Sequence, residues 1–281
     1  MPTIKAALSQ ASAIASDSAR LDAELLLCHA LGKPRTYLYT WPEAQLSDQQ
    51  ASNFNELLSR RKFGEPIAHI LGYREFWSLP LKVNASTLIP RPATEALIEW
   101  VLTQPFPSDC ELLDLGTGTG AIALALGSEK PQWQITGLDL STDAVALAQE
   151  NAQSLQIANC QFATSDWFSA IQDQHYDLII SNPPYIDAQD PHLQQGDVRF
   201  EPLSALVAEE NGLADLRRII NNAINYLKVD ATLVLEHGYQ QANEVRHMLL
   251  AAGFSQVSSG IDLDGHERFS FGRWRESQHE R

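Results

Sequence analysis

Residues 111–128 read ELLDLGTGTGAIALALGS, and this stretch decides the fold class. ELLDLG has the apolar character of a buried strand, and AIALALGS that of a helix packed against a sheet. Between them, Gly116, Gly118 and Gly120 allow a sharp turn and a close approach of the backbone to a ligand. The helix that follows offers free N–H groups at its start. This order predicts a ligand-binding turn at the carboxyl end of a parallel sheet.

The alternation of strand and helix continues along the rest of the chain. Helical patterns such as TDAVALAQENAQSL and GLADLRRIINNAINYLK separate the strand-like runs. Besides ELLDLG, the expected buried strands are WQITGLDL (133–140), CQFATSD (160–166), YDLIISN (176–182) and ATLVLEHG (231–238), and the expected edge strands are FSQVSSGI (254–261) and ERFSFGRW (267–274). We therefore predict an α/β fold with a doubly wound, mostly parallel, seven-stranded sheet.

The region before this alternation has a different character. Residues 1–73 show helical patterns only, including ARLDAELLLCHALG, which stops at Gly32, and a run that begins with Ser47 as a plausible N-cap. Residues 74–90 alternate aromatic and apolar residues as a short β-hairpin does. The expected organisation is a small helical domain (1–73), a hairpin linker (74–90) and the sheet domain (91–281).

Composition narrows the class of protein. The chain has 281 residues, 44% of them hydrophobic and 20% charged, as in ordinary globular proteins. A formal net charge of −15 is the wrong sign for a protein that holds nucleic acid through its phosphates, and it favours a protein partner. The three cysteines are widely spaced, which argues against a disulfide framework or a zinc site. We therefore expect no bound metal. The sequence shows no signal peptide and no membrane-length apolar run, so we expect a cytoplasmic protein.

Acidic and aromatic residues follow the next strands at the same edge of the sheet. Asp139 ends the second strand some 19 residues after Gly120, where a carboxylate can accept both ribose hydroxyls of an adenosine. After the third strand, Asp166 can accept from an adenine amine and Trp167 can cover its ring. The competing interpretations are a tight turn without ligand and a Trp167 that belongs to the core. No G-x-x-x-x-G-K-[ST] is present, so this is not a nucleotide triphosphate loop.

The fourth strand ends in SNPPYI (181–186), and two prolines cannot continue a central strand. DLGTGTG, Asp139 and SNPPY together resemble the class I methyltransferases that use S-adenosylmethionine, in which NPPY marks methylation of amino groups. The side-chain oxygen of Asn182 can accept one hydrogen of a planar NH2 group. Pro183 has no N–H, so its carbonyl is free to accept the other, and Tyr185 can stack on the plane. A mere Pro-Pro turn is the competing interpretation.

This arrangement suits an amide or aryl amine, whose nitrogen is a poor nucleophile because its lone pair is delocalised. Two acceptors on its hydrogens return electron density to the nitrogen and align it with the methyl group. The sulfonium donor is already activated, so the expected mechanism is a direct displacement without metal, covalent intermediate or general base.

Further segments resemble the release-factor glutamine methyltransferases, the HemK/PrmC family, over essentially the whole chain. They are REFWSLPLKV (74–83), LIPRPATE (88–95), FEPLSALVAEENGLADLR (200–217), LEHG (235–238) and GHERF (265–269). The resemblance implies N5-methylation of the glutamine in the Gly-Gly-Gln motif of class 1 peptide chain release factors, with S-adenosyl-L-homocysteine as the second product. Related ribosomal-protein glutamine methyltransferases usually carry Val-Pro-Arg-Ser where this chain has IPRP (89–92).

The resemblance also implies roles for particular residues. The expected S-adenosylmethionine site is Gly116, Thr117, Gly118, Thr119, Gly120, Asp139, Asp166, Trp167 and Asn182. The expected glutamine pocket is Asn182, Pro183, Pro184 and Tyr185, of which Asn182, Pro183 and Tyr185 are the catalytic set. The helical domain would dock the release factor, and we expect a monomer.

One position departs from the family pattern, and two neighbours are open to a structural interpretation. Ala93 stands where the family is usually acidic, which removes any role of that carboxylate in capping or substrate contact. A structural pair at the entrance to the first helix of the sheet domain explains Arg91 and Glu95 at least as well as substrate contact does.

Other functions remain open at this point. An adenine-specific nucleic-acid methyltransferase shares NPPY, but the net charge opposes it. A ribosomal-protein glutamine methyltransferase and a binding module without turnover are further alternatives. Gly116-x-Gly118-x-x-Ala121 satisfies a loose dinucleotide fingerprint, but a dehydrogenase has no use for NPPY.

Overall fold

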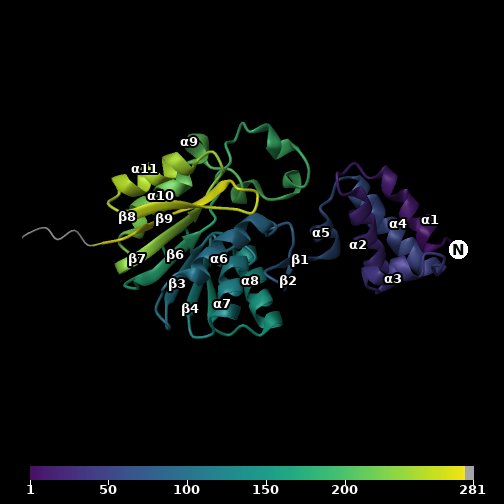
Figure 1. Cartoon of the computed structure of the whole chain (residues 1–281), viewed down its shortest axis with the longest axis horizontal. Coiled ribbons are helices and arrows are strands. Elements are labelled where there is room, and N and C mark those ends of the chain that lie inside the picture. Colours follow the sequence, from purple (N-terminus) through teal and green to yellow (C-terminus); the bar gives the residue numbers. More distant parts are fainter. Residues whose placement is uncertain (276–281) are drawn as a thin grey trace, which may run out of the picture. The chain divides into compact units, whose positions relative to one another are not determined.

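The computed structural model describes residues 1–275, which form two compact units (Figure 1). The first unit contains Met1–Tyr73 together with Pro191–Phe200, and the second contains Arg74–Asp190 and the described residues from Glu201 to Arg275. Nothing in the sequence pattern indicated that residues 191–200 belong with the N-terminal helices. None of the helices within residues 1–275 is long and apolar enough to cross a bilayer.

The first unit is all-helical, with local signals that set where its longer helices begin and end. Helix α4 begins after Ser47, which forms a capping box with Gln50, and α2 ends at Gly32 in the left-handed conformation. The apolar faces of these helices, with α1 and α3, bury one cluster that includes Leu26, Phe54 and other residues. The elements are α1 (Ile4–Leu8), η1 (Ser9–Ala13), α2 (Ala19–Leu31), α3 (Arg35–Thr40), α4 (Asp48–Lys62), α5 (Ile67–Leu71), η3 (Pro191–Gln194) and η4 (Val198–Phe200).

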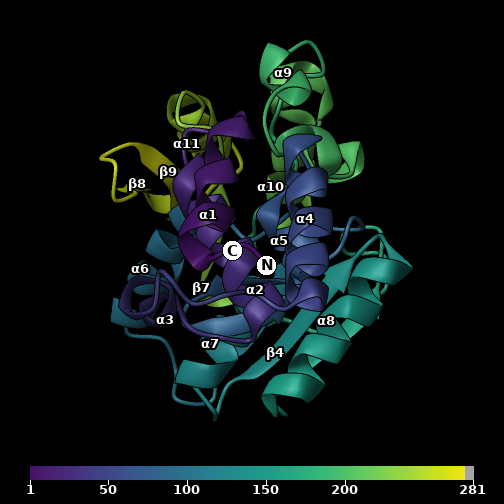
Figure 2. The same ribbon diagram turned by 90° about the vertical axis from the view of Figure 1, so that its right-hand side faces the viewer.

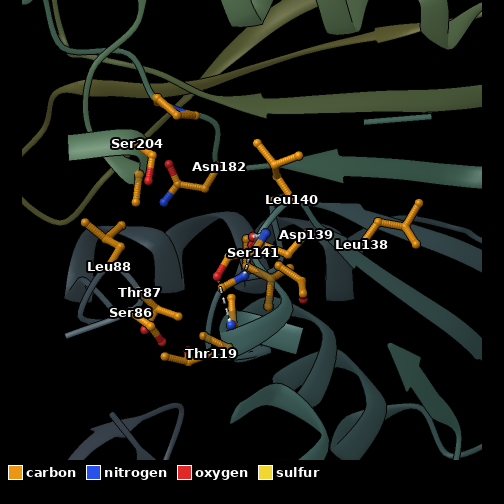
Figure 3. A pocket seen from close by; sticks show the side chains of 18 of the residues that line it. Ser86, Thr87, Leu88, Thr119, Leu138, Asp139, Leu140, Ser141, Asn182 and Ser204 are labelled. Atoms are coloured by element: carbon orange, nitrogen blue, oxygen red, sulfur yellow. Dashed lines mark hydrogen bonds between the residues drawn. The ribbon is translucent and has the colours of Figure 1, made fainter. Parts of the chain in front are cut away.

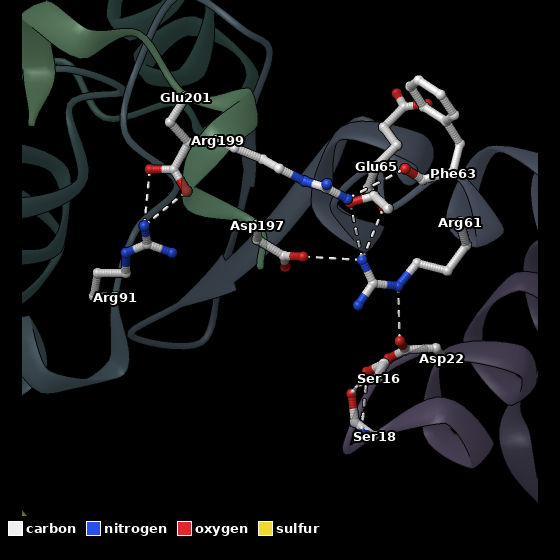
Figure 4. A network of polar contacts seen from close by, with 11 residues as sticks. Ser16, Ser18, Asp22, Arg61, Phe63, Glu65, Arg91, Asp197, Arg199 and Glu201 are labelled. Atoms are coloured by element: carbon white, nitrogen blue, oxygen red, sulfur yellow. Dashed lines mark hydrogen bonds and ion pairs between the residues drawn. The ribbon is translucent and has the colours of Figure 1, made fainter. Parts of the chain in front are cut away.

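A buried arginine joins residues 191–200 to the N-terminal helices of this unit (Figure 4). Arg61 Nε donates to Asp22 Oδ2 at 2.8 Å, and its Nη1 donates to Asp197 Oδ1 at 2.9 Å. Arg61 and Asp22 are both buried, so each requires the other as a charge partner. The network therefore fixes a segment that is more than a hundred residues away along the chain.

A two-stranded sheet of β1 (Tyr73–Phe76) and β2 (Leu79–Lys82) begins at the boundary between the units and belongs, from Arg74 onward, to the second. Trp77 and Ser78 connect the strands with positive φ angles of 51° and 61°. Two consecutive left-handed residues match the twist of a tight hairpin. This hairpin lies where the alternation of residues 74–90 predicts one.

Within residues 1–275, the main sheet has seven strands in the order β5-β4-β3-β6-β7-β9-β8. All neighbouring strands are parallel except that β9 is antiparallel to β7 and β8. The strands are β3 (Glu111–Leu115), β4 (Gln134–Asp139), β5 (Cys160–Thr164), β6 (Tyr176–Ser181), β7 (Leu227–Glu236), β8 (Ser255–Ile261) and β9 (Glu267–Arg273). The predicted doubly wound, mostly parallel, seven-stranded α/β fold is confirmed.

Helices cover both faces of this sheet, because alternate side chains of each central strand enter opposite cores. Leu178 and Ile180 of β6 pack with α6, α7 and α8, whereas Ile179 packs with α10 and α11. Figures 1 and 2 show α7 and α8 beside β4 in both views. The helical elements are η2 (Pro92–Thr94), α6 (Glu95–Thr103), α7 (Ala121–Glu129), α8 (Thr142–Leu155), η5 (Leu203–Ala205), α9 (Glu209–Gly212), α10 (Ala214–Ala223) and α11 (Ala242–Ala251).

Candidate active site

The strand order reverses between β3 and β6, and such a switch point leaves a crevice beyond the carboxyl ends of the strands. Leu115, the last residue of β3, is in register with Ser181, the last residue of β6. The Ser181 hydroxyl donates to the Leu115 carbonyl at 2.7 Å, and both residues are fully buried. The glycine-rich loop and the NPPY segment therefore leave the sheet side by side.

The glycine-rich loop crosses the end of β4. Gly118 has a φ of +55°, a left-handed conformation that glycine adopts without strain. Its N–H donates to Asp139 Oδ2 at 2.9 Å, and Asp139 Oδ1 accepts from the N–H of Ser141 at the start of α8, also at 2.9 Å. Both carboxylate oxygens are thus held by backbone donors, and each keeps a lone pair for a ligand hydroxyl.

Trp167 lines the site beside the glycine-rich loop. Its φ of +50° is unusual for a bulky residue, which marks a backbone held in place by its surroundings. The ring lies 3.7 Å from the point that a Gly116 Cβ would occupy. The nearby Asp215 carboxyl also lines the pocket, and burial raises its pKa, while the Trp167 side chain acts in the opposite direction. Asp166, beside Trp167, forms an ion pair with Arg218 at 2.8 Å.

The residues of the NPPY segment have different surroundings. Asn182 lies at the pocket, and its Nδ2 donates to Thr94 Oγ1 at 3.5 Å. The Tyr185 carbonyl accepts from Gln241 Nε2 at 3.0 Å. The Tyr185 hydroxyl approaches Arg268, and burial of this phenol, with the Glu236 carboxyl nearby, raises its pKa. Tyr185 is therefore neutral and partly built into the core.

These elements enclose a cavity of about 490 Å³, within the range of small-molecule sites (Figure 3). Nine of the residues predicted for the cofactor and glutamine sites line it: Gly116, Thr117, Gly118, Thr119, Asp139, Asp166, Trp167, Asn182 and Pro184. The other three, Gly120, Pro183 and Tyr185, are not among the lining residues. Gly120 is instead packed under the loop, against side chains of α7, α8 and β5.

The other lining residues were not among those that the sequence predicted for the site. They are Phe76, Ser86, Thr87, Leu88, Pro90, Arg91, Thr94, Ala121, Ile122, Leu138, Leu140, Ser141, Ala144, Ser165, Ser204, Ala205, Asp215 and Arg218. The segments LIPRPATE and FEPLSALVAEENGLADLR, which carry the family resemblance, contain several of them and were the available signal. The Thr87 hydroxyl is buried at this pocket and has no hydrogen-bond partner among residues 1–275, so a ligand atom can satisfy it.

The interpretation of Arg91 and Glu95 as a pair is wrong. Arg91 Nη2 donates to both carboxylate oxygens of Glu201, at 2.7 and 2.8 Å. Glu95 Oε1 instead accepts from the N–H of Trp77 in the hairpin turn, at 2.9 Å. Glu201 is buried, and a bidentate guanidinium is the partner that such a carboxylate requires. Arg91 thereby ties the segment before α6 to the segment before α10.

Comparison with known proteins shows the family to which the chain is similar. Residues 3–72 match the family described as the PrmC N-terminal domain, and residues 90–257 match the methyltransferase small domain. The chain is 54% identical over 273 residues to the release factor glutamine methyltransferase of Vibrio cholerae, covering 97% of this chain and 96% of that protein. It is 52% identical over 271 residues to that of Escherichia coli, covering 96% and 97%.

Solved structures agree on the fold. A methyltransferase from Pyrococcus furiosus has a TM-score of 0.55 at 13% identity, covering 79% of this chain and all of that one. The catalytic domain of hMettl16 has a TM-score of 0.59 at 18% identity, covering 76% and 83%. With curated relatives more than half identical over nearly their whole length, the chain belongs to the release factor glutamine methyltransferase family.

Proposed function

We propose that this protein transfers a methyl group from S-adenosylmethionine to the side-chain amide nitrogen of the glutamine in the Gly-Gly-Gln motif of class 1 peptide chain release factors. The observation that carries the proposal is the adjacency of the two loops at the switch point. A Cβ on Gly116 would lie 4.0 Å from the Asn182 carbonyl oxygen. A donor held by the glycine-rich loop would therefore present its methyl group to an acceptor held by the NPPY segment.

The pocket fits S-adenosylmethionine on several counts. Its volume of about 490 Å³ suits a nucleoside with an amino-acid tail. Asp139 would accept from the ribose hydroxyls, Trp167 would cover the adenine ring, and Asp166 would accept from its amine. The unpartnered Thr87 hydroxyl would bind a polar atom of the donor. When bound, S-adenosylmethionine supplies a methyl group activated by the positive sulfonium, and S-adenosylhomocysteine leaves.

The chain's own residues would prepare the acceptor. Asn182 Oδ1 accepts one amide hydrogen of the glutamine, and the Pro183 carbonyl accepts the other, so the amide is held in its plane with its nitrogen facing the methyl group. These acceptors gain strength as positive charge develops on the nitrogen. The nitrogen forms its bond to carbon as the bond from carbon to sulfur breaks, and it releases one proton to water.

Radiolabelled S-adenosylmethionine tests this function directly. We expect label on an intact release factor, and none when its Gly-Gly-Gln glutamine is replaced by alanine. Asn182→Ala should lower kcat by about 10²–10³-fold, the usual cost of losing one preorganised polar contact to the transition state. Label on adenine-containing DNA instead of the factor would refute the proposal. So would label that survives the glutamine replacement.

We also propose that residues 1–73 dock the release factor. Trp41, exposed over 58% of its surface in the helical unit, is a suitable probe of this surface. Trp41→Ala should raise KM for the intact factor and leave KM for a short Gly-Gly-Gln peptide unchanged. An equal effect on both substrates would refute docking at this surface.

The three free thiols, Cys28, Cys110 and Cys160, fit a reducing compartment such as the cytoplasm.

A further inference from the structure

The register of two central strands places a second polar residue beside Asn182. Ser181 of β6 pairs with Leu235 of β7, so the next residues along these parallel strands are Asn182 and Glu236. Ile180 and Val234, two positions earlier, both enter the core on the α6–α8 side of the sheet. Because side chains alternate along a strand, Asn182 and Glu236 project toward that same side.

Glu236 is a buried carboxyl group with one oxygen that lacks a hydrogen-bond partner within residues 1–275. Its side chain is 1% exposed, and this oxygen is Oε2. Thr94, itself buried, and Asn182 both lie within hydrogen-bonding reach of the carboxyl group. Burying a carboxyl oxygen without a hydrogen-bond partner lowers the stability of a fold. The presence of such a group at the acceptor site therefore requires an explanation.

These contacts select one orientation of the Asn182 amide. An ionised carboxylate can only accept hydrogen bonds, so toward these two neighbours, which both lower its pKa, Glu236 would accept an N–H from Asn182 Nδ2 and the O–H from Thr94. The second N–H of Nδ2 faces the Thr94 oxygen at 3.5 Å. Both amide hydrogens are then directed at protein acceptors, and Oδ1 is left for a ligand. The flipped amide would place Oδ1 against the carboxylate, where like partial charges repel.

We infer that Glu236 is a positioning residue, which together with Thr94 holds the Asn182 side-chain amide with its oxygen toward the acceptor glutamine. This inference rests on the proposed function. In it, the orientation of Asn182 Oδ1, which accepts from the glutamine amide, depends on Glu236. Glu236 itself makes no contact with the reacting atoms.

This role has a pH signature. Burial raises the pKa of Glu236 to about 7, against the opposing effects of the Thr94 hydrogen bond, Arg268 and Arg91. Arg268, from β9, is engaged with Asp262, and the neighbouring Tyr185 phenol has a raised pKa and stays neutral. Once protonated, the carboxyl can donate to Oδ1 and stabilise the flipped amide. Methylation should therefore increase as the pH rises through about 7.

The decisive variants are Glu236→Gln and Glu236→Met. The first keeps the shape and loses the ionisable group, and the second removes every acceptor. We expect kcat to fall by about 10-fold for glutamine and about 10²-fold for methionine, since a misplaced catalytic contact costs on this order. The dissociation constant of S-adenosylmethionine should stay unchanged, and the rise of kcat near neutral pH should disappear.

A double-mutant cycle separates positioning from a merely structural role. If Glu236 acts through Asn182, then Glu236→Gln should cause no further loss of kcat in an Asn182→Ala background. Ser270→Ala is the matched control, because Ser270 is buried at the same end of the sheet and bonds His237, the next residue of β7. The control should lower stability and keep the pH profile of the wild type. Additive losses of kcat in the cycle would overturn the inference.

A measurement without turnover completes the test. In the wild-type protein, the Asn182 side-chain NH2 resonances should shift with a midpoint near neutral pH, and in Glu236→Gln they should not. Resonances that are independent of pH in the wild type would overturn the inference even if the release factor is methylated. The expected shift in a protein that leaves the release factor unlabelled would sustain the positioning geometry and refute the proposed function alone.

Discussion

Gly120→Ala is the substitution whose cost the structure defines best. Gly120 precedes α7 with a φ of +80°. A Cβ there would lie 3.1 Å from Leu124 Cδ1 and 3.2 Å from both Ala148 Cβ and Phe162 Cζ. The new methyl group would therefore enter a packed junction between α7, α8 and β5 in a backbone conformation that disfavours alanine.

Two contributions set the size of the effect. A left-handed alanine costs about 1–2 kcal/mol. Overpacking a filled core by one methyl group adds about 1–3 kcal/mol. The free energy of unfolding should therefore fall by about 2–5 kcal/mol. The entropy that alanine removes from the unfolded chain offsets this loss by about 0.4–1 kcal/mol.

Gly118→Ala is the matched control in the same loop. Its φ is +55°, and the nearest atom to a Cβ there is Thr87 Cβ at 3.9 Å, an ordinary contact. Only the backbone cost of about 1–2 kcal/mol applies. Gly118 lines the pocket whereas Gly120 does not. In Gly118→Ala, the loss in the binding free energy of S-adenosylmethionine should therefore exceed the loss in the free energy of unfolding.

Urea unfolding followed by tryptophan fluorescence measures this difference. Of the six tryptophans only Trp41 lies in the helical unit, so the signal reports mainly on the second unit. Titration calorimetry of each folded variant gives the affinity for S-adenosylmethionine. Equal losses of stability in the two variants would refute the packing argument, and so would a Gly120→Ala protein as stable as the wild type.

Three further predictions concern charges and buried polar groups. Burial raises the pKa of Asp114 from 3.8, its value in the unfolded chain, to about 7 in the folded protein. The folded state therefore holds this proton more tightly, and the resulting stabilisation is full below pH 3.8 and is lost as the pH rises through about 7. Asp114→Asn should therefore gain stability relative to the wild type over this interval, measured as urea midpoints at several pH values, and a constant difference would contradict the assignment. Asn151 Nδ2 bridges the Thr119 carbonyl at 3.0 Å and the β2 backbone, so Asn151→Ala should lose about 1–3 kcal/mol in urea unfolding and weaken donor binding; an unchanged midpoint would contradict this bridge. Asp197→Ala removes the partner of Arg61 on residues 191–200 and should speed limited proteolysis within that segment alone, whereas unchanged cleavage would show that the ion pair does not hold it.

Local pattern was sufficient for the elements of the sheet domain. Each of the seven predicted strands is present, because the continuous apolar runs between turn residues are long enough for buried strands and too short for helices. The capping pattern at Ser47 and the glycine at position 32 likewise marked the ends of helices. Such signals depend on neighbours in the chain, so a sequence displays them directly.

Contacts between distant segments could not be predicted in the same way. Arg91 has acidic residues close by in the chain, yet its partner is Glu201, because only the fold determines which carboxylate is buried within its reach. The left-handed backbone of Trp167 is likewise invisible in the sequence, since surrounding packing overrides the residue's own preference.

The sequence by itself determined the fold class, the glycine-rich loop and the NPPY segment, because each depends on the chemistry of a few consecutive residues. The tertiary structure decided which residues surround the pocket and that residues 191–200 belong to the helical unit. It also placed Glu236 beside Asn182, through the register of β6 and β7. Register follows from the packing of whole strands, so no short stretch of either strand specifies it.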